Sequence, residues 1–112
     1  MNSLDILKIT NDALAEKKGI NIKAIDISNI SVMADYFIIV SGSSSKQVQA
    51  LADNVSLKLA ENKLHPKSIE GYDKANWILM DIEDVIVHIF DKESREFYDL
   101  ERIWSDGKEV NL

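Results

Sequence analysis

The sequence contains no cysteine, which excludes disulfides, thiolate metal sites and a cysteine nucleophile. Because a secreted domain this small would usually need disulfides, we expect a reducing, cytoplasmic environment. No apolar run approaches the about eighteen residues that a membrane span requires. The first eight residues also lack the basic start and the apolar stretch of a secretory signal. We therefore expect no membrane contact.

Basic residues are scarce as well. The 112 residues include 13 Lys and Arg against 19 Asp and Glu, a net charge of −6. Such a surface repels phosphate backbones, so little direct nucleic-acid contact is expected. The imbalance is uneven, since residues 1–68 carry a net charge of +1 and residues 69–112 carry −7. The acidic part is typical either of a well-solvated surface or of a face that docks on a basic partner.

Apolar residues make up 46% of the chain, enough for one hydrophobic core and a single domain over residues 1–112. The periodicity predicts an α/β fold with a mixed sheet of about five strands covered by helices. The run Tyr36–Val40 is continuously apolar and predicts a central strand that is covered on both faces. The tail after Ser105 is expected to fray. The predicted helices span residues 4–18 and 48–62, and short helices are predicted within 91–104. The predicted strands span residues 20–27, 36–40, 68–72, 77–80 and 85–90, of which the last two form a hairpin.

A turn between a strand and a helix, residues 41–46, is the first candidate for chemistry. Open α/β sheets bind anions at such turns, but Gly42 stands alone and no nucleotide-binding fingerprint follows it. A serine-rich helix cap explains the same residues without a ligand.

Nucleotidyltransferases also begin with a Gly-Ser turn, and they need two carboxylates, two residues apart, on the adjoining strand to hold magnesium ions. Here Glu70 is followed by Tyr72 at that spacing, and the pair Asp81 and Glu83 falls on a hairpin tip. We therefore predict no catalytic residue, no metal and no cofactor. The alternative is a residual nucleotidyl- or phosphotransferase that uses the Gly42-Ser43 turn.

The two histidines do not assemble a site. His65 precedes the only proline in a loop, where it is expected to meet solvent. His88 alternates with Ile86 and Phe90 on one strand face, which is typical of a core or interface residue rather than a catalyst.

Six of the eight aromatic residues lie in the last 41 residues, among the acidic ones. Aromatic anchors ringed by charge are typical of protein-binding surfaces, although they could equally build the core. For Phe97 and Trp104 the core is the favoured interpretation. Trp77 begins a hairpin strand after a polar bend, and we expect it to be exposed and to anchor an interface.

Four stretches together resemble the ribosomal silencing factor family, also called Iojap-like. They are ADYFIIVSGSS at 34–44, WILMD at 77–81, DVIVHIF at 84–90 and REFYDLERIW at 95–104. The chain departs from the family at the hairpin tip, where Ile82-Glu83 stands in place of an expected glycine.

The resemblance implies a nucleotidyltransferase-like fold without enzymatic activity. It implies a translation repressor that binds the large ribosomal subunit through its ribosomal protein fourteen, sterically blocks joining of the small subunit and forms homodimers. A basic ribosomal protein also fits the acidic C-terminal part better than RNA does. The residues of this chain that the resemblance places on the docking side are Trp77, Asp81, His88, Arg95, Glu96 and Tyr98.

Overall fold

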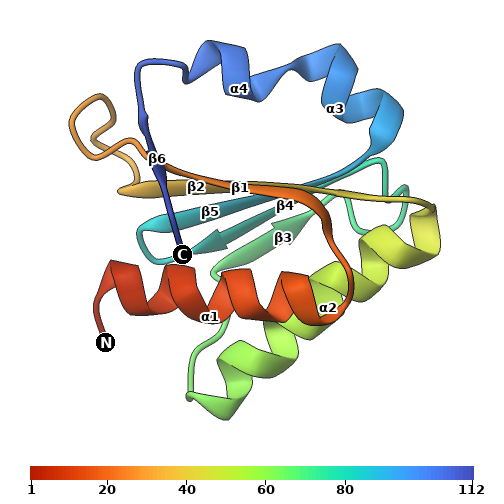
Figure 1. Ribbon diagram of the computed structural model, residues 1–112. Helices are drawn as coiled ribbons and strands as arrows, with labels where there is room; N and C mark the ends of the chain where they lie inside the picture. The colour runs from red at the N-terminus through yellow and green to blue at the C-terminus, as the bar shows by residue number, and fades with distance from the viewer.

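The computed structural model describes residues 1–112, apart from the side chain of Ile103, which therefore lies outside the described residues. The chain alternates helices and strands around one mixed sheet (Figure 1). In chain order the elements are α1 (Ser3–Glu16), β1 (Ile20–Asp26), β2 (Tyr36–Gly42), α2 (Ser45–Glu61), β3 (Ser68–Glu70), β4 (Trp77–Ile82), β5 (Val85–Asp91), α3 (Lys92–Tyr98), α4 (Leu100–Ile103) and β6 (Lys108–Val110).

The strands lie in the order β3-β4-β5-β2-β1-β6, with β2 and β5 parallel and the other neighbours antiparallel. The predicted α/β class is confirmed, and the apolar run of β2 is central and buried, as expected. The sheet has six strands where about five were expected, and the expectation of a frayed tail was wrong, because the tail is ordered as β6. A three-residue strand is too short to show a period, yet it pairs with β1 through Ala24 and Val110.

α1 and α2 pack side by side on one face of the sheet (Figure 1). Asn2 caps the N-terminus of α1, because its side chain accepts a hydrogen bond from the backbone N–H of Asp5 at 2.9 Å. Asn54 of α2 donates to the carbonyl of Ala13 at 2.8 Å and joins the two helices. Their apolar stripes form the main core with the inward side chains of the strands, which leaves the opposite face of the sheet to α3 and α4.

α3 and α4 cover part of the other face (Figure 1). Asp91 begins α3 by accepting a hydrogen bond from the N–H of Ser94 at 2.8 Å, and Asp99, with a left-handed φ of 48°, separates the two helices. A smaller core lies beneath them, made of Ile25, Ile27, Ala34, Phe37, Ile39 and Phe90. No helix of the described chain is long and apolar enough to cross a membrane.

The predicted hairpin of β4 and β5 is confirmed by their antiparallel pairing. Its tip is Glu83-Asp84, and Glu83 adopts a left-handed φ of 50°. A glutamate thus occupies a turn position at which glycine is the more favourable residue. The hairpin fixes which side chains of β4 and β5 share a face.

Candidate functional site

The helices α3 and α4 leave the outer half of their sheet face uncovered. Residues paired across neighbouring strands point to the same side. In β4, Ile78, Met80 and Ile82 are fully buried on the α1–α2 side, whereas the alternate residues are only half-buried. We call this uncovered region the open face; it consists of Ser68, Glu70, Trp77, Leu79, Asp81 and Ile86.

An aromatic ridge, made of Trp77, Tyr98 and Phe97, borders the open face. The rings of Trp77 and Tyr98 lie 4.5 Å apart between centroids, and those of Tyr98 and Phe97 lie 5.1 Å apart, edge to face. Tyr98 is 43% exposed and Phe97 81% exposed. Such a contiguous exposed aromatic surface is typical of a protein-binding site.

Two expectations about the aromatic residues need correction. Phe97 was expected in the core, but α3 is one short helix that turns this side chain to solvent while Arg95 points inward. Trp77 was expected to be exposed, but it is half-buried because it stacks on Phe90 at 5.2 Å. Trp104, as expected, packs on the smaller core through Phe37.

His88 lies beneath the ridge and is 5% exposed. Its Nδ1 accepts a hydrogen bond from Nε1–H of Trp77 at 3.1 Å, so the neutral imidazole carries its proton on Nε2. Burial lowers the pKa of His88 to about 4, which keeps the ring neutral. Nε2 is buried and has no hydrogen-bond partner among the described residues. The placement of His88 on an apolar face is as predicted.

The charged side chains of the open face are acidic. Glu70 of β3 pairs with Leu79 of β4, and Asp81 pairs with Ile86 of β5, so two carboxylates alternate with apolar side chains. At the hairpin tip the exposed Glu83 lies 3.9 Å from Lys67, a pair that water screens and that adds little stability. The open face therefore offers apolar contact and negative charge together.

The bend that precedes β4 fixes the position of Trp77. Gly71 has a φ of 81°, and a Cβ atom at this position would clash with the carbonyl oxygen of Trp77. The N–H of Ala75 donates to the carbonyl of Gly71 at 3.0 Å, and the N–H of Asp91 donates to that of Asn76 at 3.0 Å. The backbone on both sides of Trp77 is therefore held in place.

Of the six predicted docking residues, the structure brings three into contact, Trp77, His88 and Tyr98, and it places Asp81 on the same face of the sheet. Arg95 and Glu96 do not join them. Arg95 is 8% exposed and is bound within the molecule, and Glu96 is exposed on the side of α3 where both residues line a shallow cavity. Their docking role stays a prediction.

Glu70, Leu79, Ile86 and Phe97 also belong to this surface but were not among the predicted docking residues. Leu79 and Ile86 follow from the alternation and register of the hairpin, which the sequence does contain. Glu70 depends on the pairing of β3 with β4, and Phe97 depends on the break at Asp99, so neither position has a clear local signal.

The Gly42-Ser43 turn satisfies its own hydrogen-bonding groups. The N–H and the hydroxyl of Ser43 both donate to Oε1 of Gln47, at 2.5 and 2.6 Å, and Ser44 caps α2 by accepting from the N–H of Gln47. Within the described part of the chain, no group of three His, Cys, Asp or Glu side chains could hold a metal ion. The turn therefore has the features of a helix cap.

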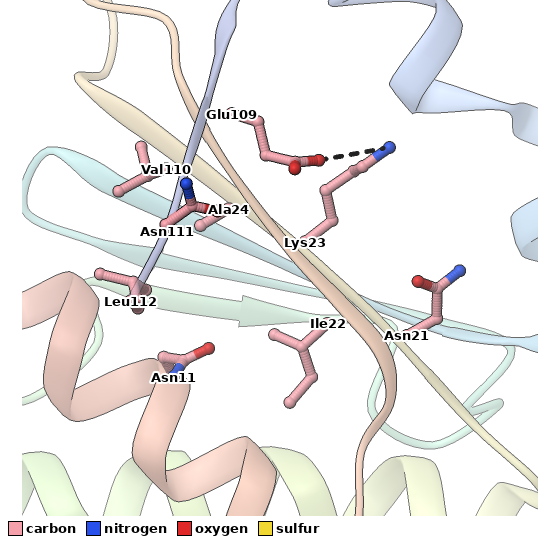
Figure 2. Close-up of a pocket in the computed structure, with 9 residues that line it drawn as sticks. All are labelled: Asn11, Asn21, Ile22, Lys23, Ala24, Glu109, Val110, Asn111 and Leu112. Atoms are coloured by element: carbon pink, nitrogen blue, oxygen red, sulfur yellow. Dashed lines mark ion pairs between the residues drawn. The ribbon is translucent and has the colours of Figure 1, made fainter.

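A separate cavity of about 350 Å³ lies between α1, β1 and the end of the chain (Figure 2). Lys23 of β1 and Glu109 of β6, on neighbouring strands, form an ion pair beside it with Nζ and Oε1 3.7 Å apart, so their charges offset one another. None of the described side chains that line it carries a buried, unpaired polar atom. The cavity therefore presents no concentrated chemistry for a ligand.

Comparison with known proteins finds relatives that match the whole chain. A family model described as ribosomal silencing factor during starvation matches residues 1–112. The ribosomal silencing factor RsfS of Bacillus subtilis is 44% identical over 112 residues, which cover 100% of this chain and 95% of that protein.

Solved structures show the same fold. A crystal structure of a Chromobacterium violaceum protein superposes with a TM-score of 0.92 at 33% identity, covering 100% of this chain and 92% of that one. One from Bacillus halodurans gives a TM-score of 0.87 at 36% identity, covering 98% and 100%. The family match over the whole chain and the identity to the Bacillus subtilis protein show that this chain belongs to the ribosomal silencing factor family, RsfS.

Proposed function

We propose that the protein is a translation repressor that binds the large ribosomal subunit and sterically blocks joining of the small subunit. The observation that carries the proposal is the aromatic ridge of Trp77, Tyr98 and Phe97 beside the acidic open face. The relatives are named ribosomal silencing factors, and this surface has the chemistry of a protein interface.

The charge of the surface supports a basic protein as the contact, and we propose the subunit's ribosomal protein fourteen. Glu70 and Asp81 would attract lysine and arginine side chains and repel RNA phosphates. The half-buried Leu79 and Ile86 supply apolar area that a partner can cover. We therefore expect contact with a ribosomal protein and little contact with ribosomal RNA.

Steric blocking of subunit joining requires only that the bound protein occupies space that the small subunit would need, so the proposal includes no catalysis and no cofactor. A chain of 112 residues is large enough for an interface of standard size, about 800 Å² per partner. We also propose that the protein works in the cytoplasm and forms a homodimer in solution.

Co-sedimentation with purified large and small subunits tests the proposal. The wild-type protein is expected to sediment with large subunits only. Asp81→Lys is expected to weaken this binding, whereas Asp12→Lys, an identical charge change on the exposed side of α1, is expected to leave it unchanged. Equal sedimentation with both subunits, or equal weakening by both variants, would contradict the proposed surface.

A further inference from the structure

We infer that His88 is a positioning residue for docking: its Nδ1 holds the indole N–H of Trp77 and thereby sets the orientation in which that ring meets the partner. This inference rests on the proposed function of the open face. His88 itself is buried, so it acts through Trp77 rather than by touching the partner.

The geometry shows why the hydrogen bond matters. The ring of Trp77 stacks on Phe90 at 5.2 Å and packs at a tilt against Tyr98 at 4.5 Å, and such ring contacts allow a ring to slide and turn in its own plane. The hydrogen bond from Nε1 of Trp77 to Nδ1 of His88, at 3.1 Å, is directional and fixes the rotation of the indole ring. The orientation in which the indole meets the partner is therefore defined before binding, which reduces the ordering that docking requires.

The surroundings of His88 argue against a purely structural role. Its strand neighbours are Leu79 and Ile39, and its ring packs on Phe37 and Phe90. In such a site an apolar side chain would avoid the burial of Nε2, which has no partner among the described residues. The gain that offsets this cost is the acceptor that His88 gives to Trp77.

The arrangement also defines what the partner presents at this point. Because His88 takes the only hydrogen-bond donor of the indole, the partner meets a ring surface without a free N–H. Apolar side chains and cations both bind such a surface, and the nearby carboxylates favour the cations. We therefore expect an arginine or lysine of the partner to lie over Trp77.

Two substitutions separate positioning from packing. His88→Leu fills the site but removes the acceptor, whereas His88→Asn keeps an acceptor oxygen near the position of Nδ1 and leaves a smaller, more polar side chain. We expect His88→Leu to melt at or above the wild-type temperature yet to bind large subunits roughly two- to tenfold more weakly, the loss of one hydrogen bond. We expect His88→Asn to melt lower but to bind more tightly than His88→Leu.

The indole N–H resonance of Trp77 in ¹⁵N-labelled protein reports the hydrogen bond directly, with Trp104 as the internal reference. Its hydrogen exchange is expected to be slow in the wild type and in His88→Asn, and fast in His88→Leu. If binding instead follows thermal stability, so that His88→Leu binds as tightly as the wild type, the positioning role is wrong. If Trp77→Ala itself binds at wild-type strength, the proposed docking surface is wrong, which is a distinct result.

Discussion

The Nε atom of Arg95 lies 2.7 Å from Oε1 of Glu101, and this ion pair joins α3 to α4 across the left-handed residue Asp99. Nη1 of Arg95 also donates to the carbonyl of Ile20 at 3.2 Å and to the hydroxyl of Ser41 at 3.1 Å. One guanidinium therefore ties the helical cover to the ends of β1 and β2. Because Phe97 and Tyr98 follow Arg95 on α3, the same contacts support the aromatic ridge.

Arg95→Met is expected to lower the free energy of unfolding by about 2–4 kcal/mol, because it leaves Glu101, Ser41 and a backbone carbonyl without their partner. Urea denaturation followed by circular dichroism measures this change. Lys23→Met breaks the exposed pair with Glu109, at 3.7 Å, and should cost at most about 1 kcal/mol. Equal costs for the two variants would show that Arg95 does not tie the layers together.

Trp77→Ala is expected to reduce both binding and stability, because the side chain is half-buried against Phe90 and Tyr98. We expect an affinity loss of about thirtyfold for large subunits, typical of an aromatic hot spot, and an unfolding cost below the about 3–5 kcal/mol of a fully buried tryptophan. Binding titrations and thermal melts measure the two effects. Leu57→Ala, at a 56% exposed position of α2, is the control that should change neither.

Phe97→Ala tests the aromatic ridge without disturbing the core, because this side chain is 81% exposed. Its free energy of unfolding should stay within about 0.5 kcal/mol of the wild type, as at other exposed positions. Its affinity for large subunits should nevertheless fall, since the partner would lose apolar contact with the end of the ridge. Unchanged affinity would exclude Phe97 from the interface and would confine docking to the open face.

The sheet was predictable where the sequence repeats a simple period. The apolar run of β2 predicted the central strand, and the alternation in β4 and β5 predicted the hairpin and the strand face that His88 shares with Ile86 and Phe90. The strand β6 was not predictable, because three residues are too few to show a period. Its pairing also depends on β1, which is far from it in the sequence.

The candidate site was predictable only in part, for a related reason. Trp77, Asp81 and His88 lie on paired strands, so their proximity follows from the hairpin register. The inward direction of Arg95 and the outward direction of Phe97 depend on where α3 stops, and that is decided by the left-handed conformation of Asp99. A left-handed aspartate has no sequence signal as strong as a glycine has.

Gly71→Ala is expected to disturb the bend that leads into Trp77. The position needs a φ of 81°, and an added Cβ would meet the carbonyl oxygen of Trp77. We expect a loss of at least about 1–2 kcal/mol of unfolding free energy together with weaker binding. Asp73→Ala changes an exposed residue of the same bend and should leave the melting temperature nearly unchanged.

His88 predicts a pH dependence of stability with a definite direction. The pKa of His88 is about 4 in the folded protein, against an ordinary value of 6.5, because burial disfavours the charged ring. As pH falls below 6.5 the unfolded chain therefore takes up the proton first, and the free energy of unfolding decreases until the pH reaches the folded pKa. The total decrease is up to about 3 kcal/mol, and above pH 6.5 this residue contributes no pH dependence.

Urea denaturation at a series of pH values between 7 and 4 measures this slope against two variants. Asp26, whose pKa is lowered by hydrogen bonds from Ser28, also loses its stabilising charge in acid, so the wild-type slope alone does not isolate His88. His88→Leu removes only the histidine contribution and should therefore have a smaller slope between pH 6.5 and 4. Leu57→Ala, a change at an exposed apolar position without a titratable group, should keep the wild-type slope. If His88→Leu leaves the slope unchanged, the buried ring accepts a proton in the folded state as readily as in the unfolded one. Its protonated Nδ1 would in that case no longer accept the indole N–H of Trp77 near pH 6.5.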